Sequence, residues 1–449
     1  MNIQKNSQKS PLPVSPKFDM NIKPTPDTVE SPNQANHQPD NVQLASYPTS
    51  MVNLLKTIIG SGILGLPLAI VEFGLVTGLC LMFAAAFLAT FGLHILNVAA
   101  MQLGRKSSFA GLCSLTYPKA AFSFDFAIAI KCIGTTIAYF TVIGTTFISL
   151  VKAIIGEDTK PEGAILSLML SRPFVVSFSA ILIAPVCFMR KMDSLKYTSY
   201  AGMAAVLYLV ILTVVNFFIT ESASFGNIPL FVKPSLSMFS YYGSFVFAYT
   251  CHQNILPIQN EARNNTPRGM MNVIATSMTT ATIFYLAVAI FGAATYGSEV
   301  KDNILANMQP NIFTYAARIF YILLLLVSVP LQVFPCRLSI EKMTLFYMRA
   351  ERLTKSTAEY LFFGSTIAIL ILTAGVACFD IGLKIVLQIV GAVAGTFICY
   401  FLPSIIFNKL FEGTSWNWRR IGSYVLLASG FVSFVLSSIG IVANIFFSK

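Results

Sequence analysis

The sequence predicts an all-α integral membrane protein with eleven membrane-spanning helices. Of its 449 residues, 55% are hydrophobic and 11% are charged, and the mean hydropathy is +0.71. Soluble domains of this length do not have such a composition. Apolar runs close to the ~20 residues that cross a bilayer recur after residue 50. We expect the spans near residues 51–70, 75–100, 124–155, 173–189, 196–219, 235–257, 271–296, 312–335, 359–379, 383–407 and 419–446.

The beginning of the chain differs from the rest because it holds no apolar run. Residues 1–50 contain 8 of the 21 prolines and many Asn, Gln and Ser residues, a composition that cannot bury enough apolar surface to offset chain entropy. We expect residues 1–49 to be a disordered cytosolic tail without a signal peptide, and residues 50–449 to form one transmembrane domain. Ser-Pro and Thr-Pro pairs in the tail could be phosphorylation sites or chance products of its composition. The pairs are Ser10-Pro11, Ser15-Pro16, Thr25-Pro26 and Ser31-Pro32.

The distribution of basic residues predicts the orientation of the chain. The net charge is +11, and 20 of the 30 Lys and Arg residues lie in the tail or in loops on its side of the membrane, against seven on the other side. Cytoplasmic loops carry an excess of Lys and Arg, so the N-terminus is expected in the cytosol and the C-terminus on the lumenal or extracellular side. This bias explains the positive charge without nucleic acid as a partner, and the lipid bilayer is the expected surrounding.

Two of the expected spans are interrupted near their middles. Span 51–70 contains Gly60-Ser61-Gly62, and span 235–257 contains six consecutive polar or weakly polar residues at 249–254. A helix in hydrocarbon satisfies its own backbone hydrogen bonds, so a break costs several kcal/mol unless another group, such as a bound solute, replaces them. The two spans are the first and the sixth, which are equivalent positions if the spans divide into five, five and one.

Paired interruptions in equivalent spans are typical of secondary transporters built from two inverted repeats. We therefore expect a five-plus-five inverted repeat of the leucine-transporter type, with broken helices 1 and 6 and an additional helix 11. The span count and the matching breaks carry this prediction, because the two halves show no clear residue-level similarity.

Several sequence blocks resemble the amino acid/auxin permease family, and in particular its fungal vacuolar amino acid transporters. These blocks are residues 54–67, 126–134, 245–254, 260–261 and 330–332, and the likeness extends over roughly residues 50–445. The resemblance implies eleven spans, a cytosolic N-terminus and amino acid transport. Animal sodium-coupled neutral amino acid transporters are relatives with a large, cysteine-bearing loop between spans 5 and 6. The corresponding loop here, residues 220–234, is short and lacks cysteine, which favours the vacuolar branch.

The two breaks supply the candidate substrate-binding residues. Glycine lets the backbone unwind near residue 61, and the half-helix that follows offers free N–H groups and a positive dipole end to an amino acid carboxylate. Carbonyl groups released in the second break would face the α-amino group. The alternative is that the glycines only allow a neighbouring helix to approach, which is also how we interpret Gly391 and Gly395. The predicted substrate-binding residues are Thr57, Gly60, Ser61, Gly62, Tyr249, Thr250, Cys251 and Asn254.

Ionisable residues inside spans are candidates for coupling to an ion gradient, because their burial is costly. His252 lies in the second break and has an unperturbed pKa near 6.5, but it could equally be a structural histidine bonded to a carbonyl. Lys131 could take the place of a coupling cation, or it could pair with Asp125. Glu261 is a third candidate.

No catalytic constellation or phosphate-binding glycine loop can be assembled from the sequence, so we expect no enzyme activity, no resident metal and no cofactor. We expect a secondary active amino acid transporter, proton-coupled, that moves its substrate across a vacuolar or lysosome-like membrane toward the cytosol. The alternatives are a sodium-coupled symporter of the plasma membrane and an amino acid sensor that uses the same site.

Overall fold

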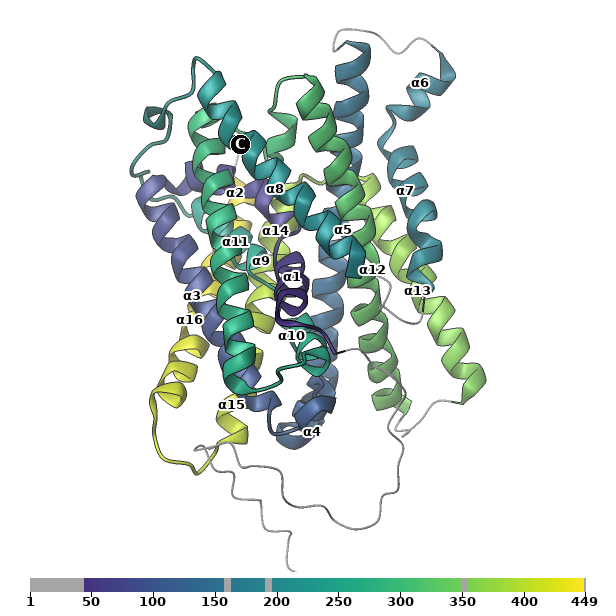
Figure 1. Ribbon diagram of the computed structural model, residues 1–449, viewed down its shortest axis with the longest axis vertical. Coiled ribbons are helices and arrows are strands. Elements are labelled where there is room, and N and C mark those ends of the chain that lie inside the picture. The colour runs from purple at the N-terminus through teal and green to yellow at the C-terminus, as the bar shows by residue number, and fades with distance from the viewer. Residues whose placement is uncertain (1–43, 157–162, 190–195, 349–353, 448–449) are drawn as a thin grey trace, which may run out of the picture.

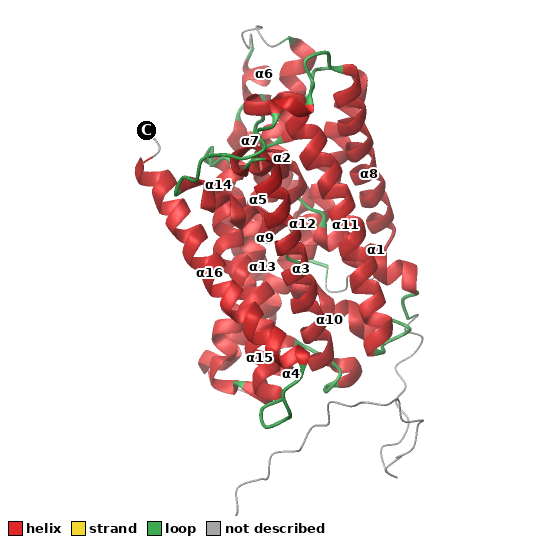
Figure 2. Ribbon diagram, turned by 90° about the vertical axis from the view of Figure 1, so that its left-hand side faces the viewer, coloured by secondary structure: helices red, strands yellow, loops and turns green. Residues whose placement is uncertain are grey.

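The computed structural model describes residues 44–156, 163–189, 196–348 and 354–447. The expectations for residues 1–43, including the Ser-Pro and Thr-Pro pairs, therefore lie outside the described residues. The described chain forms a bundle of helices, most of which run along the long axis of the molecule (Figures 1 and 2). One isolated β-bridge joins Ala45 to Ala262. The prediction of an all-helical membrane protein is confirmed.

The described residues form sixteen α-helices along the chain. They are α1 (Tyr47–Ile58), α2 (Gly62–Phe73), α3 (Leu75–Ala100), α4 (Phe109–Thr116), α5 (Ala121–Ile155), α6 (Ala164–Met169), α7 (Arg172–Cys187), α8 (Lys196–Ile219), α9 (Tyr242–Ala248), α10 (His252–Glu261), α11 (Pro267–Tyr296), α12 (Ile312–Met348), α13 (Lys355–Cys378), α14 (Leu383–Val390), α15 (Leu402–Leu410) and α16 (Trp418–Phe447). Short 3-10 turns occur at Gly104–Lys106, Pro118–Ala120, Phe225–Asn227, Ser237–Tyr241, Gly297–Glu299 and Ile304–Ala306.

The prediction of eleven spans is confirmed only in part. Among the described residues, 8 helices are long and apolar enough to cross a membrane, and α1 with α2 forms a ninth, bent span. The expected span at 173–189 corresponds to α7, which ends at Cys187 after 16 residues. The expected span at 235–257 is divided by a break into α9 and α10, which have 7 and 10 residues. Neither of these two regions is a long continuous helix.

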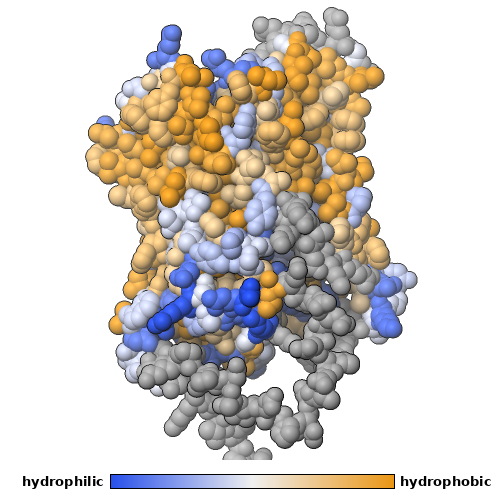
Figure 3. Space-filling model, in the orientation of Figure 1, coloured by the Kyte–Doolittle hydropathy of each residue, from blue (hydrophilic) through white to orange (hydrophobic). Residues whose placement is uncertain are grey.

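The centre of the bundle is formed by α5, along which α12 packs. Along its most apolar stretch, α5 has 78% of its residues buried, compared with 28% for α8 and for α16. Helices that are apolar but exposed fit a lipid environment, where apolar side chains need no protein cover. Figure 3 shows apolar residues over the upper part of the visible face and hydrophilic residues below, at the end where α4 and α15 lie.

Two π-helical segments, Gly391–Gly395 and Phe397–Phe401, connect α14 to α15. The first segment packs against α9 at very short range. A Cβ on Gly391 would lie 1.8 Å from Gly243 O, and a Cβ on Gly243 would lie 2.4 Å from Gln388 O. Only glycine fits at either position, which confirms a packing role for Gly391.

Two buried arginines on α12 bind backbone carbonyls and so tie the bundle together. Arg318 donates to Leu305 O at 3.1 Å and to Ser149 O at 3.1 Å. Arg337 donates to Cys187 O at 3.0 Å, and its guanidinium lies 4.1 Å from the centre of the Phe362 ring. Both cations are thus part of structural contacts between helices and loops.

Candidate substrate site

The first broken span bends by 55° between α1 and α2. The last residue before the break, Ile58, is followed by Ile59 in an extended conformation (φ −87°, ψ 101°). Helical structure resumes at Gly62. The predicted interruption at Gly60 and Ser61 is therefore confirmed, while Gly62 already belongs to the second half-helix.

The second broken span is interrupted over three residues, Tyr249 to Cys251, rather than over the six that were predicted. His252, Gln253 and Asn254 form the first turn of α10. Side-chain polarity was a poor guide to the end of the break, because the first turn of a helix needs no intrahelical partner for its N–H groups and accepts polar residues.

Two buried tyrosine hydroxyls satisfy carbonyl groups that the breaks release. The hydroxyl of Tyr285 on α11 lies 2.8 Å from both Ile58 O and Ala248 O, which end the first half-helix of each broken span, so its single proton is shared between the two carbonyls. Tyr321 on α12 donates to Gly60 O at 2.7 Å. The protein itself therefore supplies hydrogen bonds in the place where we expected a bound solute to supply them.

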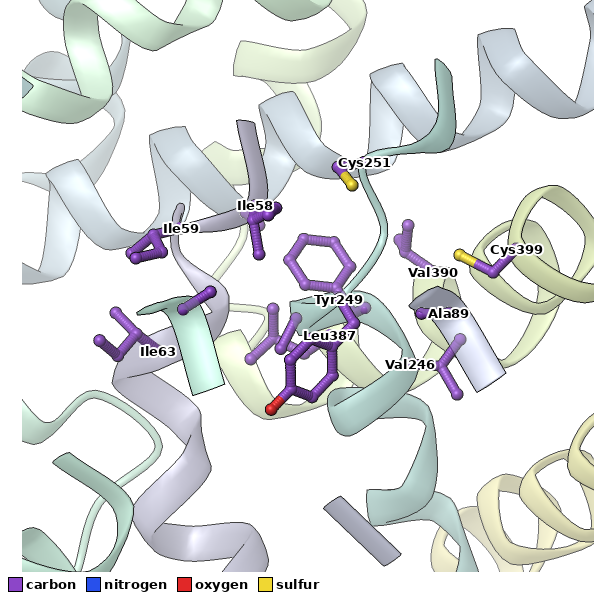
Figure 4. Close-up of a cluster of buried hydrophobic side chains, with 14 of the residues drawn as sticks. Ile58, Ile59, Ile63, Ala89, Val246, Tyr249, Cys251, Leu387, Val390 and Cys399 are labelled. Atoms are coloured by element: carbon purple, nitrogen blue, oxygen red, sulfur yellow. The ribbon is translucent and has the colours of Figure 1, made fainter. Parts of the chain in front are cut away.

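The two breaks border a common cavity of about 10 Å³, the room that roughly one water molecule needs. Figure 4 shows residues of both breaks in one cluster of buried side chains, with Ile58 and Ile59 from the first break and Tyr249 and Cys251 from the second. The residues that line the cavity come from α1, α5, α9 and the breaks, and they are Thr57, Ile58, Gly60, Lys131, Thr135, Tyr139, Phe247 and Thr250. The lining offers several hydroxyl groups and one ammonium group, and none of these eight side chains is a carboxylate.

One face of α5 contributes three polar residues to this cavity. Lys131, Thr135 and Tyr139 are spaced by four positions, which places them on one face of a helix. Lys131 Nζ donates to Gln332 Oε1 on α12 at 3.4 Å. Asp125 instead accepts from Ser339 at 3.4 Å, so the predicted alternative of a Lys131–Asp125 pair is wrong. Asp125 and Lys131 are six positions apart on α5, and six positions turn a helix by about 240°, so the two side chains lie on different faces.

The predicted substrate-binding residues divide into two groups. Thr57, Gly60 and Thr250 line the cavity. The other five are not among its lining residues, although most lie buried beside it. Ser61, Tyr249 and Cys251 are buried, Gly62 is packed against α9, and Asn254 lies in the first turn of α10.

Gly62 and Gly60 meet different kinds of neighbour. A Cβ on Gly62 would lie 3.1 Å from Ala248 Cα, which is backbone, and 3.3 Å from Phe247 Cδ1. A Cβ on Gly60 would lie 2.8 Å from Tyr139 Oη, the end of a side chain. Gly62 thus allows α2 to approach α9, as in the packing alternative, whereas Gly60 opens onto the cavity.

His252 is fully buried but does not line the cavity. Its Nε2 would lie 2.9 Å from a Cβ on Gly92, so the ring is directed toward α3. Neither ring nitrogen forms a hydrogen bond of normal geometry with the described residues, although the backbone of Ala89 on α3 is close enough to interact with the ring. The alternative of a histidine bonded to a carbonyl therefore stays a prediction, with Ala89 as the partner.

Glu261 lies at the other end of α10, where it is exposed. Its carbonyl accepts from Ala45 N at 2.8 Å, and Arg105 Nη1 donates to Ala262 O at 3.0 Å. The side chain of Asn260 binds Ser107 through both its oxygen and its nitrogen. This end of α10 is thus joined to the loop after α3 and to the residues that precede α1.

Sequence reasoning missed most of the residues that complete the site. The spacing of Lys131, Thr135 and Tyr139 was a readable signal. Tyr285 and Tyr321 gave none, because they lie 227 and 261 positions away from the carbonyls that they bind at the first break.

Taken together, the fold and the site define a multi-pass membrane protein in which two broken helices meet at a polar cavity, the arrangement of a secondary transporter. The chain belongs to the transmembrane amino acid transporter protein family, whose model matches residues 44–446.

Similar proteins include both fungal and animal members. The chain is 32% identical to vacuolar amino acid transporter 5 of Schizosaccharomyces pombe, over 81% of this chain and 84% of that protein. It is 27% identical to vacuolar amino acid transporter 5 of Saccharomyces cerevisiae, over 82% and 90%. It is 23% identical to putative sodium-coupled neutral amino acid transporter 10 of Xenopus laevis, over 86% of this chain but 36% of that protein. These relatives are transporters, in agreement with the prediction that the chain is not an enzyme.

Proposed function

We propose that this protein is a secondary active transporter that moves amino acids across a vacuolar or lysosome-like membrane toward the cytosol, coupled to protons. One observation carries the proposal: the breaks of two helices border one small cavity lined by hydroxyl groups and a lysine. The fungal vacuolar relatives support the choice of membrane.

The proposal includes eleven spans in a five-plus-five inverted repeat. In it α7 and the pair α9–α10 also cross the bilayer. The 16 residues of α7 extend about 24 Å, which a locally thinned bilayer accommodates. The basic bias of the loops supports a cytosolic N-terminus.

In this proposal the amino acid binds between the breaks. Its carboxylate approaches Lys131 and the N-terminus of α2, and its amino group approaches the carbonyls that Tyr285 and Tyr321 now occupy. A cavity with room for about one water molecule cannot hold an amino acid, which is several times larger than water. The cavity must therefore widen before substrate enters, as alternating access requires.

The proposed coupling ion is the proton, and His252 is the first candidate to carry it. A pH difference of two units is worth ~2.7 kcal/mol per proton, at ~1.36 kcal/mol per unit. One coupled proton can therefore support roughly a hundredfold substrate gradient.

The test uses purified protein in proteoliposomes and a panel of radiolabelled amino acids. We expect exchange of labelled for unlabelled substrate in the absence of ion gradients, and accumulation when only a pH gradient is applied. His252→Asn should retain exchange and lose accumulation. His94→Asn is the matched control, because His94 stacks on Trp418 at 5.5 Å and has no proposed role in coupling.

Other outcomes point to the alternatives. Accumulation driven by sodium alone would identify a sodium symporter, as the name of the Xenopus relative indicates for that protein. Binding of amino acid without exchange would identify a sensor. If His252→Asn still accumulates substrate on a pH gradient alone, Lys131 or Glu261 becomes the next coupling candidate.

A further inference from the structure

Among the described residues, the buried cations include Lys56, Lys131, Arg318 and Arg337. The two arginines bind backbone carbonyls between helices and loops, and Lys131 lines the cavity. Lys56 has no role in the mechanism described so far, although it is 4% exposed and lies in the last turn of α1.

The side chain of Lys56 is held between three helices. A Cβ on Gly202 of α8 would lie 3.7 Å from Lys56 Cε and 2.7 Å from Leu324 Cδ1 of α12. Gly202 thus leaves room at the contact of α1, α8 and α12. The next residues along α1, Thr57 and Ile58, line the cavity, so Lys56 lies immediately behind the first break.

The C-terminal end of a half-helix attracts cations, because its carbonyl groups form the negative end of the helix dipole. In transporters with broken helices, such ends and the unwound carbonyls coordinate the coupling cation. Here these carbonyls already accept hydrogen bonds. Leu54 O accepts from Thr57 at 2.8 Å, Ile58 O from Tyr285 at 2.8 Å, and Gly60 O from Tyr321 at 2.7 Å.

We propose that Lys56 supplies the positive charge at the end of α1, in the place where a sodium-coupled carrier holds its ion. The inference rests on the proposed transport function and adds to it that the protein needs no sodium at this break. Lys131 is less suited to this role, because it lies within the continuous helix α5, not at the end of a half-helix, and lines the cavity.

The test compares the wild-type protein with Lys56→Arg and Lys56→Met in proteoliposomes, using a tritiated amino acid mixture. Lys56→Arg retains the charge, and Lys56→Met retains the apolar stem without it. Lys233→Met, in an exposed loop, is the control substitution. Uptake on a pH gradient is measured in sodium and in N-methyl-D-glucamine buffers, and folding is checked by thermal denaturation in detergent.

We expect equal wild-type uptake in the two buffers, near-normal uptake by Lys56→Arg and Lys233→Met, and a loss of about tenfold in Lys56→Met, the change that ~1.4 kcal/mol produces. Normal uptake by folded Lys56→Met overturns the inference. If Lys56→Met does not fold, the wild-type protein decides, because a requirement for sodium overturns the inference by itself. A lack of wild-type exchange without gradients would instead overturn the transport function, and with it the inference.

Discussion

Replacing Gly60 and Gly62 separately by alanine distinguishes the binding surface of the first break from its packing surface. Neither glycine has a positive φ angle, so alanine introduces no backbone strain at either position. The two new methyl groups differ only in what they contact. The methyl group at position 60 would face the Tyr139 hydroxyl beside the cavity, and the methyl group at position 62 would face the backbone of Ala248.

The geometry sets the expected magnitudes. In Gly62→Ala the methyl group would lie 3.1 Å from Ala248 Cα, which cannot rotate away, and such overpacking costs ~1–3 kcal/mol of stability. In Gly60→Ala the methyl group would lie 2.8 Å from the end of the Tyr139 side chain, which can rotate, so the loss of stability should be smaller than in Gly62→Ala. Its methyl group would instead occupy a cavity of about 10 Å³. We expect KM to rise by about tenfold, which corresponds to ~1.4 kcal/mol.

The assay is thermal denaturation of both variants in nanodiscs, together with the KM of uptake in proteoliposomes, normalised to folded protein. Gly62→Leu should lower protein abundance as well as uptake. The reverse pattern, with a stable Gly62→Ala of altered KM and an unstable Gly60→Ala of normal KM, would refute this assignment of the two surfaces.

Two further predictions concern the tyrosine hydroxyls and the orientation of the chain. Tyr285→Phe leaves buried carbonyls at both breaks without their donor, and the free energy of unfolding in a chaotrope should fall by ~1–3 kcal/mol. The control is Tyr208→Phe, which removes an exposed hydrogen bond to Phe313 O and should lower the free energy of unfolding by less than about 0.5 kcal/mol. Equal stability of the two variants would contradict the proposed role of Tyr285. Asn264, in the sequon between α10 and α11, should stay unmodified in a glycosylating host because its loop is expected in the cytosol, and a mass shift on endoglycosidase treatment that Asn264→Gln abolishes would invert the orientation.

The sequence was informative about the breaks because their residues act locally. Gly60 and Ser61 interrupt an apolar run, and the structure bends the chain there. The polar run that begins at Tyr249 located the second break but not its length. Its last three residues are as compatible with a first helical turn as with an unwound segment, so their side chains could not separate the two.

The sequence was much less informative about what closes the site. Hydrogen bonds from Tyr285 and Tyr321 depend on which helices are neighbours in the bundle, and a single sequence does not contain that information. His252 was chosen because it is titratable and adjacent to the break, yet its ring is directed toward α3. Lys56 was not among the coupling candidates, and a single sequence does not show whether a lysine near the start of an apolar run is buried in the bundle or reaches the interface.

The contact between Gly243 and Gly391 has a consequence for genetics. The clash that a side chain would make at either position is with the partner's backbone or with that of Gln388, and no mutation can make a backbone smaller. A defect caused by Gly243→Ala should therefore have no suppressor among substitutions at the facing residues. Suppressors, if they arise in a selection for growth, should lie where α9 or the π-helical segment is anchored, because only a shift of a whole helix can relieve the overlap.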